Sequence, residues 1–499
     1  MKKKLEAAME HIRDEHIAEA ATYRKKRSLA PWLGAVAAVL AVCICAGVLW
    51  RPFGADPVAT LSDPAVNPMT GGGSINKGAH IKYAIASPVY PEVCGYPLAE
   101  DYEYAQWQAW WDGQRALHDQ PEGYADSLRD YFAASTALLL GSGSGENAAC
   151  SPVNIYMALA MLAEVTGGES RGQLLELLNA DSIEALREQA GHVWQAHYND
   201  DGLSTSILAA SLWLSKVYSC NENTVKTLSD SYYASVFRGD LGSEEMNEAL
   251  RSWLSQQTGG LLDEFVGDVS MDPRTVLALA STIQYQVQWM NDPFSAEATT
   301  QETFHGAKGD TTEDFMHTTF MSGTYYWEDR FGAATLSLED GSTMWLFLPD
   351  ESVTPEQLMS GGDIFNFFAQ DPAAYDSSYA NKKNLIVNLS LPKFDIASET
   401  DLIGQLQTMG VTDVFQPGVA DFSPIFTEED GGCVDTIQHA ARVAIDEEGV
   451  TAAAYTLILR AGAGMPPQEE IDFILDRPFA FVIESQDGLP LFAGIVNEP

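Results

Sequence analysis

The stretch DEEGVTAAAYTLILR, residues 446–460, runs on into AGAGMPP, residues 461–467, and the two halves carry conflicting local signals. From Gly449 to Ala454 the side chains are small or β-branched, whereas 461–467 is rich in glycine and proline and predicts an exposed loop. Successive side chains of a strand point to opposite faces. Laid out as a strand, one face would consist of Val450, Ala452, Ala454, Thr456 and Ile458. That face is uncharged and could enter a core, and such conflicts tend to occur at functional sites.

Two ordinary interpretations compete for this segment. A run of alanines favours a helix, with Gly449 near its start, and a Gly/Pro-rich tail is commonly only a connector. Taken alone, the segment favours these interpretations, so the choice depends on the rest of the chain.

Composition excludes some function classes. The chain has 499 residues, is 46% hydrophobic and carries a formal net charge of −42, so it can bury a large core and is not a disordered protein. A phosphate backbone would be repelled, so we expect no nucleic-acid partner. Outside the apolar segment described next, Cys94, Cys150, Cys220 and Cys433 are widely spaced and show no metal-site pattern. Two disulfides are possible, but isolated small hydrophobes are the favoured interpretation.

The N-terminal part predicts a membrane anchor. Residues 1–29 form a charged head, and residues 30–50 have no charged side chain and are long enough to cross a bilayer. The basic run 24–27 precedes them, which predicts a cytoplasmic N-terminus and an external C-terminal domain. A cleaved signal peptide, hence a secreted protein, is the alternative. Residues 51–121 read as an extracellular linker, although its tryptophans, Trp107, Trp110 and Trp111, are expected to pack onto the domain more readily than to bind a carbohydrate.

The domain proper is predicted over 122–499. Helical patterns dominate its first half, including a buried helix that Ser151 caps and that continues to Val165. Strand patterns begin with 206–214 and 275–289 and dominate after Trp289, which predicts an α+β domain. Signatures of catalysis, including zinc-protease, P-loop and serine-hydrolase motifs, are absent from the sequence. We therefore expect no enzyme activity, no metal and no cofactor.

Several ordered motifs together resemble one family, the serpins, over roughly 122–499. Each motif alone is weak, but their order is specific. They are NAACSPVN (147–154), Trp253 with TGG (258–260), the 275–289 strand with Pro293-Phe294, LPKF (391–394), DEEG with AAA (446–454), RPF (477–479), and LFAGIVN (491–497) with Pro499.

This resemblance implies a serpin-like fold with three β-sheets, a large central sheet among them, eight to nine helices and an exposed reactive-centre loop. It also implies suicide inhibition. A target protease cleaves the loop and is trapped as an acyl-enzyme, while residues Val450 to Ala463 insert as a strand into the central sheet. The small uncharged face of the hinge fits that demand, because burying an unpaired charge is costly.

The family's usual spacing from Glu447 puts the reactive bond at Ala463-Gly464, which suits an elastase- or subtilisin-like protease. The loop is about four residues longer than in common members, so Arg460-Ala461, a trypsin-like site, is the alternative. The resemblance assigns the hinge to Glu447, Glu448, Gly449, Val450, Thr451, Ala452, Ala453 and Ala454.

Two supporting sites carry over from the family. The shutter, a hydrogen-bonded cluster that lets the sheet open, corresponds to Ser151, Asn154, Ser281 and His439, with Asn154 and Ser281 departing from the usual residue types. The breach, where a salt bridge holds the hinge, corresponds to Lys393 with Glu447, near Trp289.

The sequence thus predicts a monomeric, membrane-anchored, outward-facing inhibitor of extracellular serine proteases, with papain-like proteases as further targets and a bacterial cell surface as the setting. A non-inhibitory binding or structural module with the same fold is the main alternative. A hydrolase with an unrecognised site is disfavoured, because no nucleophile–base spacing stands out.

Overall fold

The computed structural model describes residues 79–97, 104–141, 143, 145–263, 267, 269–374, 377–428, 432–434, 437–450 and 469–499. The chain divides into two compact units, Met1–Asn67 and Pro68–Pro499, and every described residue belongs to the second. The predicted charged head and membrane segment lie outside the described residues.

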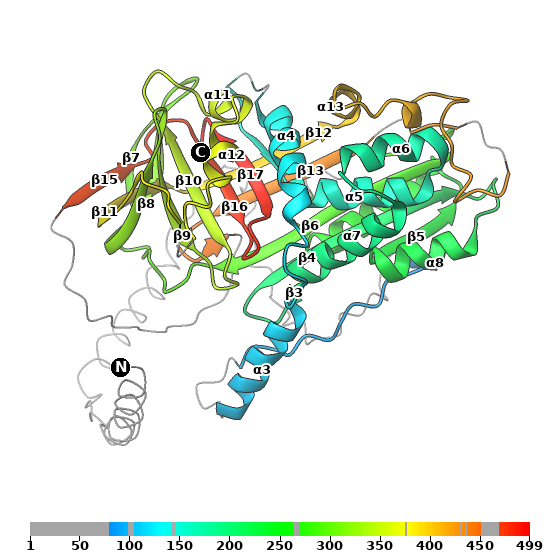
Figure 1. Ribbon diagram of the computed structural model, residues 1–499, viewed down its shortest axis with the longest axis horizontal. Coiled ribbons are helices and arrows are strands. Elements are labelled where there is room, and N and C mark those ends of the chain that lie inside the picture. Colours follow the sequence, from blue (N-terminus) through cyan, green and yellow to red (C-terminus); the bar gives the residue numbers. More distant parts are fainter. Residues whose placement is uncertain are drawn as a thin grey trace, which may run out of the picture. The chain divides into compact units, whose positions relative to one another are not determined.

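An eight-stranded sheet carries the hinge of the predicted loop (Figure 1). Its strands in spatial order are β1 (Ala84–Ala86), β5 (Ala234–Gly239), β4 (Thr205–Ser215), β6 (Leu277–Gln288), β14 (Gly449–Val450), β13 (Gln438–Ile445) and β12 (Phe394–Asp401), with β3 (Asn199–Asp200) paired to β4. The two strands predicted around 206–214 and 275–289 are confirmed as β4 and β6, which pair antiparallel.

A nine-stranded sheet holds most of the later strands. It contains β15 (Glu470–Ile474), β11 (Lys382–Pro392), β8 (Gly309–Trp327), β9 (Phe331–Ser337), β10 (Thr343–Pro349), β16 (Phe479–Glu484), β17 (Pro490–Val496) and β2 (Ala148–Cys150), with β7 (Thr300–Gly306) paired to β8. The expectation of three sheets therefore differs from the structure, which has two among the described residues. The reason is β8, which runs unbroken for 19 residues and pairs with β7, β11 and β9.

Ten α-helices lie wholly within the described residues. They are α3 (Tyr104–Leu117), α4 (Arg129–Leu140), α5 (Pro152–Val165), α6 (Gly168–Leu177), α7 (Ile183–His197), α8 (Glu222–Ser231), α9 (Glu244–Gln257), α11 (Pro355–Ser360), α12 (Asp363–Phe368) and α13 (Ile403–Thr408). Three short 3₁₀ helices accompany them: η1 (Ile81–Tyr83), η2 (Asp126–Leu128) and η3 (Asp413–Phe415). The α+β prediction is confirmed, and the ten α-helices of the described residues exceed the expected eight to nine by one or two.

Helix α5 is the buried helix that the sequence predicts. The Ser151 hydroxyl accepts a hydrogen bond from the Asn154 N–H, and Pro152 occupies the first turn, where its missing N–H costs nothing. Every residue of α5 is buried, as expected for a helix that is apolar all round. Its side chains share one core with inward-facing residues of both sheets.

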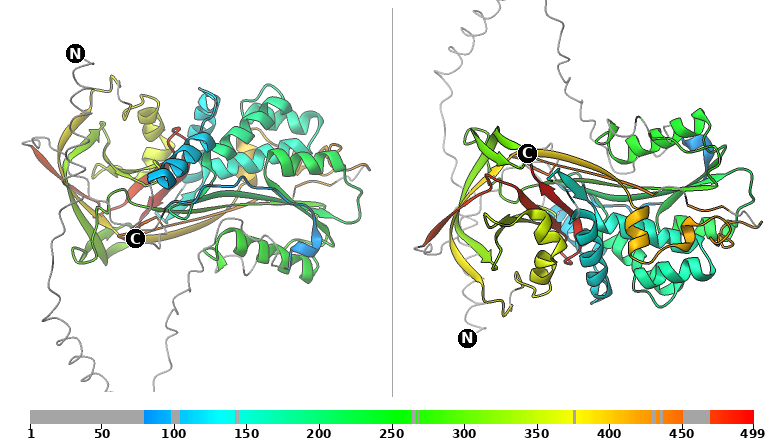
Figure 2. Two further views of the ribbon diagram at one scale, coloured as in Figure 1. Left: turned by 90° about the horizontal axis from the view of Figure 1, so that it is seen from below. Right: turned by 90° about the horizontal axis from the view of Figure 1, so that it is seen from above.

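Helices cover both faces of the eight-stranded sheet. On one face lie α5 and α7, and on the other lies α9 (Figure 2). Alternation along β4 explains this arrangement: Leu212 and Leu214 belong to the core that contains α5, while Trp213 packs with Trp253 of α9. A sheet covered on both sides favours apolar residues on both faces, and β4 is buried almost throughout, with Ser206, Ser211 and Ser215 as its buried polar residues.

Part of the segment predicted as a linker joins the domain. Strand β1 pairs with β5, and Trp110 of α3 is buried, with its Nε1 donating to Asp201 Oδ2 at 2.9 Å. The packing of Trp110 agrees with the expectation for the tryptophans. The described part of 79–121 contributes a strand and a helix to this unit.

Candidate functional site

The hinge enters the eight-stranded sheet through a tight turn. Asp446 Oδ1 accepts hydrogen bonds from the Glu448 N–H at 2.8 Å and the Gly449 N–H at 3.2 Å. The Asp446 N–H in turn donates to the Gly449 carbonyl at 3.1 Å. Aspartate favours such turns because its side chain accepts hydrogen bonds from backbone N–H groups two and three residues later. The turn reverses the chain from β13 into β14.

Trp289 clamps this turn from the end of β6. Its Nε1 donates to the Asp446 carbonyl at 2.8 Å, and its backbone N–H donates to the Glu448 carbonyl at 3.0 Å. The Trp289 ring is 1% exposed. The turn is therefore held by both the side chain and the backbone of one buried residue.

Glu447 is anchored on the opposite side. Its Oε2 pairs with Lys393 Nζ at 2.7 Å, and its Oε1 accepts from the Thr299 hydroxyl at 2.6 Å. Burial acts to raise the pKa of Glu447, but the Lys393 ammonium and the Thr299 hydroxyl outweigh it and hold the pKa below its usual value. The carboxylate stays ionised, so the pair persists at neutral pH.

Strand β14 is a two-residue wedge between β6 and β13. Gly449 pairs with Gln288, and Val450 pairs with Val287 on one side and Ile445 on the other. Within the described part of the chain, β6 and β13 are joined only through β14. The junction between β6 and β13 is therefore held by few interstrand hydrogen bonds. A further strand would enter the sheet there with the smallest loss of hydrogen bonds.

The wedge needs glycine at its first position. A Cβ at Gly449 would lie 2.3 Å from the Val287 carbonyl oxygen and 2.7 Å from Gln288 Cα, both of them backbone atoms. Val450, by contrast, is 2% exposed and packs in the main core. Close backbone approach explains the glycine.

A second cluster lies beneath the same sheet. The Ser151 N–H donates to His439 Nε2 at 3.0 Å, and His439 is 3% exposed. Burial lowers the pKa of His439 to about 4, so the ring is neutral and carries its hydrogen on Nδ1. Among the described residues neither that Nδ1 nor Asn154 Nδ2 has a hydrogen-bond partner.

Ser281 is the predicted member of this cluster that the structure leaves apart. It is half-buried on β6, opposite Ala210 of β4, and the described residues include no hydrogen bond from it to His439. The structure brings together Ser151, Asn154 and His439, and it brings together Trp289, Lys393 and Glu447. Glu448 lies on the turn, and burial raises its pKa, with Asp446 and Glu447 adding to the effect.

The remaining predicted residues lie outside the described residues. They are Thr451, Ala452, Ala453 and Ala454 of the hinge, the bond Ala463-Gly464 and its alternative Arg460-Ala461. Asp446 belongs to the DEEG motif of the sequence analysis, and the structure adds its role in the turn, which an aspartate three residues before a glycine favours. Thr299 is the contributor that the sequence analysis missed, and nothing local marks it.

Other expectations concern metals, cysteines and the membrane. No group of three or more His, Cys, Asp or Glu in the described part of the chain could hold a metal ion.

Cys150 is a buried thiol, and burial raises its pKa to about 12. Within the described ranges no helix has the length and apolar character needed to span a bilayer, and the predicted segment 30–50 is not among them.

Comparison with known proteins gives consistent matches. A family model described as Serpin (serine protease inhibitor) matches residues 130–499. Plasminogen activator inhibitor 1 of Bos taurus is 27% identical over 406 residues, covering 78% of this chain and 96% of the relative. Serpin-Z2A of Oryza sativa subsp. japonica is 27% identical over 410 residues, covering 72% and 93%.

Solved structures match over the same region. AtSerpin1 of Arabidopsis in the native stressed conformation gives a TM-score of 0.63 at 25% identity, covering 76% of this chain and all (100%) of that one. The thermophilic serpin tengpin in its native state gives a TM-score of 0.65 at 23% identity, covering 76% and 95%.

Proposed function

The chain belongs to the serpin family, and we propose that it is an extracytoplasmic suicide inhibitor of serine proteases. In this proposal a protease cleaves the loop near Ala463-Gly464, and residues Val450 to Ala463 then insert between β6 and β13. The inserted strand carries the covalently bound protease with it, which distorts the protease active site before deacylation.

The observation that carries the proposal is the wedge formed by β14. Val450 is already buried between β6 and β13, and alternate residues of a strand share a face. Ala452, Ala454 and Thr456 would therefore follow Val450 into the core. All are small, and none carries a charge.

The hinge contacts support a loop that is attached firmly at its N-terminal end. Lys393, Thr299 and Trp289 hold the turn at 446–449 through side-chain contacts. Insertion that starts from this end can extend residue by residue from β14, because the first two pairs are already formed.

The first test uses pancreatic elastase, subtilisin and trypsin as probes. We expect a complex with elastase or subtilisin that survives SDS and boiling, and a released C-terminal fragment whose sequence begins at Gly464. A fragment beginning at Ala461 would move the bond to Arg460 and the target class to trypsin-like proteases. Cleavage by all three proteases without any stable complex would show a substrate, and would favour the non-inhibitory module.

A matched pair of variants tests the inserting face. Ala454→Asp adds a charge to the face that would enter the main core with Val450. Ala453→Asp adds the same charge to the opposite face, where the register of Val450 opposite Val287 would place it beside Gln284, a half-buried polar residue. Burying an unpaired carboxylate costs several kcal/mol. We expect Ala454→Asp to be cleaved without forming the stable complex and Ala453→Asp to inhibit normally; equal inhibition by both would contradict insertion.

We also propose that residues 30–50 anchor the protein in a cell membrane, with the domain outside and the setting a bacterial surface. The support is the uncharged segment and the basic run that precedes it. The full chain should remain in the membrane pellet after carbonate washing, and protease added to intact cells should remove the domain. Recovery from the medium with an N-terminus beyond residue 50 would favour the secreted alternative.

A further inference from the structure

Helix α3 presents a surface that loop insertion does not use. The helix precedes the stretch 130–499 that the family model matches, so it is an addition to the matched domain. One of its faces is held by the body of the domain. Gln114 Nε2 donates to Asp201 Oδ2 at 3.2 Å, the same oxygen that accepts from Trp110, and Leu117 packs against the main core. These contacts fix the position of α3 on the domain.

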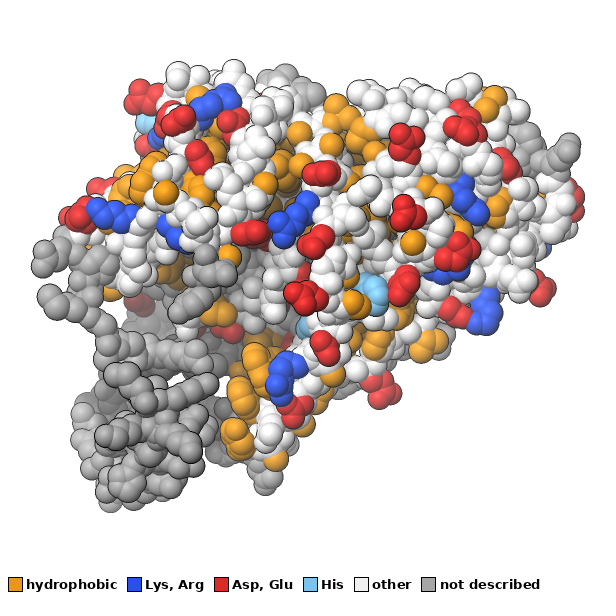
Figure 3. Space-filling model, viewed as in Figure 1, with side chains coloured by type: hydrophobic (Ala, Val, Ile, Leu, Met, Phe, Trp, Pro, Cys, Tyr) orange, Lys and Arg blue, Asp and Glu red, His pale blue; other side chains and the backbone are white. Residues whose placement is uncertain are grey.

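A row of aromatic rings lies beside that held face. Tyr104, Trp107 and Trp111 recur at helical spacing. Their rings stack in order, with centroids 5.9 Å apart in each of the two successive pairs. Tyr104 is 68% exposed and Trp111 is 45% exposed, and hydrophobic side chains gather on the free end of α3 (Figure 3). Contiguous exposed rings of this kind mark an interaction surface.

The row of rings continues toward the hinge of the reactive loop. Trp107 and Trp111 line a cavity of about 970 Å³ together with Met290. Met290 directly follows Trp289, which clamps the hinge turn, and it is itself 38% exposed. We call Tyr104, Trp107, Trp111 and Met290 the α3 patch. It joins the free part of α3 to the end of the sheet at which the loop begins.

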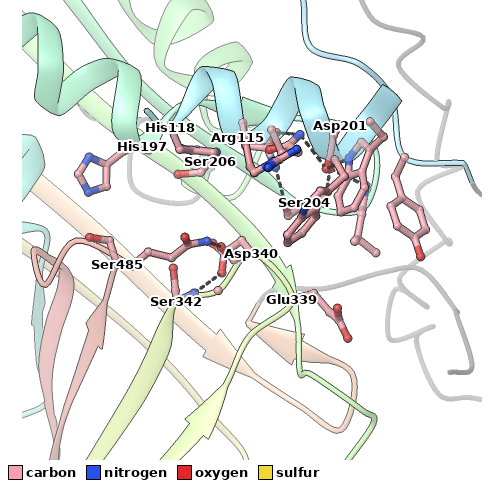
Figure 4. Close-up of a pocket in the computed structure, with 18 of the residues that line it drawn as sticks. Arg115, His118, His197, Asp201, Ser204, Ser206, Glu339, Asp340, Ser342 and Ser485 are labelled. Carbon is pink, nitrogen blue, oxygen red and sulfur yellow. Dashed lines mark hydrogen bonds between the residues drawn. The ribbon is translucent and has the colours of Figure 1, made fainter. Parts of the chain in front are cut away.

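The cavity close-up shows the same arrangement. The Glu339 N–H donates to the Gln288 carbonyl at 3.0 Å, which places Glu339 at the hinge end of β6. In Figure 4, Glu339 lies toward the end of the cavity where Asp201 meets α3, and His118 and His197 lie toward the other end. The first turns of α3 are therefore on the hinge side of the cavity.

Charge beside the patch restricts the partner. Arg115 is the only lysine or arginine in the cavity lining, and it already pairs with Asp112. Carboxyl groups dominate that lining, and they are Asp112, Asp119, Asp201, Glu339, Asp340 and Asp487. Basic groups of a partner would be attracted there. A second copy of this chain, with a net charge of −42, would be repelled.

A protease bound at the reactive bond lies within reach of the α3 patch. The 14 residues from Val450 to Ala463 span at most about 46 Å. A protease of about 250 residues has a radius of gyration of about 18 Å, hence a diameter of about 46 Å. One protease diameter therefore covers the distance from the reactive bond to the hinge. A second contact made within the same complex benefits from a high effective concentration.

We propose that the α3 patch is a second docking surface for the target protease. It would receive an apolar patch flanked by lysine or arginine beside the protease's active-site cleft. This inference rests on the proposed function and adds a determinant of specificity outside the loop. Tryptophan and tyrosine are the side chains that dominate binding energy at protein interfaces. A lipid bilayer suits this surface less well, because it would also cover the hinge from which the loop emerges.

The test measures how fast the full chain forms the SDS-stable complex with whichever of elastase, subtilisin and trypsin reacts fastest. Tyr104→Ala/Trp111→Ala removes two exposed rings and should lower the second-order rate constant about tenfold. The number of inhibitor molecules consumed per protease should not change, because the loop and the insertion line are untouched.

A blocked protease isolates the second contact. The same protease, sulfonylated at its active-site serine, cannot be acylated by the loop but keeps its surface. Added in excess, it should slow complex formation by the parent protein and have no effect on the double variant. Slowing of both proteins to the same extent would overturn the inference.

Val217→Ala is the matched control. Val217 is 76% exposed and follows the C-terminal end of β4, which runs antiparallel to β6, so it lies at the end of the sheet away from the hinge. This variant should react like the parent protein. Equal rates for the parent protein and Tyr104→Ala/Trp111→Ala would overturn this inference alone. Failure of all three proteases to form a stable complex would overturn the proposed function as well.

Other occupants of the patch would give different results with Tyr104→Ala/Trp111→Ala. A lowered melting midpoint would show that the rings pack within their own chain, and a change from dimer to monomer would show that they bind a second copy. Weaker binding to lipid vesicles would show that they contact a membrane. Each of these results would overturn the inference.

Discussion

His439 is neutral in the folded protein, and only one of its two ring nitrogens has a hydrogen-bond partner among the described residues. Its Nε2 accepts from Ser151, but its Nδ1 and the nearby Asn154 Nδ2 have no partner within the described ranges. A buried polar group left unsatisfied costs about 1–3 kcal/mol. The cluster of Ser151, Asn154 and His439 is therefore not fully hydrogen-bonded.

The pKa of His439 predicts a pH effect on stability. Burial lowers it from 6.5 to about 4, so between those values the unfolded chain takes up a proton that the folded chain does not. Stability from this group is complete above pH 6.5 and falls as pH drops toward 4, by about 3 kcal/mol. The protonated ring would also set an N–H against the Ser151 N–H.

Comparison with His439→Gln isolates this contribution, because other groups titrate equally in both proteins. Glutamine keeps an acceptor for Ser151 and has no charge to gain. The difference in free energy of unfolding between the two proteins, from urea melts at pH 7, 5.5 and 4, should shrink or reverse by about 3 kcal/mol. A difference that does not vary with pH would contradict the assignment.

Strand β14 shows how a two-residue element controls a whole sheet. It supplies the only connection between β6 and β13 among the described residues, and it does so because Gly449 allows backbone to approach backbone. The turn at Asp446 and the clamp by Trp289 fix its position. The element depends on contacts around it, since two residues of strand have no stability of their own.

Gly449→Ala should detach this element. The added Cβ would overlap two backbone atoms of β6, so we expect a loss of about 1–3 kcal/mol and faster amide exchange in 446–450 and 285–289. Gly404→Ala on α13 is the control, because nothing lies within 4 Å of its Cβ position. That variant should be neutral or stabilised by up to about 1 kcal/mol. Unchanged exchange in Gly449→Ala would refute the steric account.

At the scale of the whole domain, the length of the proposed inserted strand is comparable to the length of β6. Strand β6 has 12 residues, about 40 Å at 3.3 Å per residue, and residues 450–463 extended would span about 46 Å. An inserted segment could thus pair with β6 over its full length in place of the two residues of β14.

Loop cleavage should therefore stabilise the molecule. Nicked protein should melt at least about 10 °C above the intact form, because several kcal/mol gained in a domain of this size move the midpoint by a few degrees each. Calorimetry before and after cleavage measures this shift. Nicked Ala454→Asp serves as the control and should show no rise. An unchanged midpoint for the nicked parent protein would contradict insertion.

Much of this architecture is readable from local pattern. Helix α5 and strands β4 and β6 lie where the sequence predicts them, because the spacing of apolar residues reflects burial on one or both faces. The small uncharged face that starts at Val450 is visible for the same reason. The order of the motifs also indicates the family without any tertiary information.

Contacts between residues that are far apart in the sequence leave no signal in the local sequence pattern. Thr299 and Glu447 meet across 148 positions, and Trp110 and Asp201 across 91. The later strands join in one sheet because β8 continues as a single strand of 19 residues that pairs with β7, β11 and β9. The acidic cavity forms where α3 lies beside turns from the far end of the chain. Periodicity reports how deeply a residue is buried but not which residue it meets, since partners are chosen by the packing of whole elements.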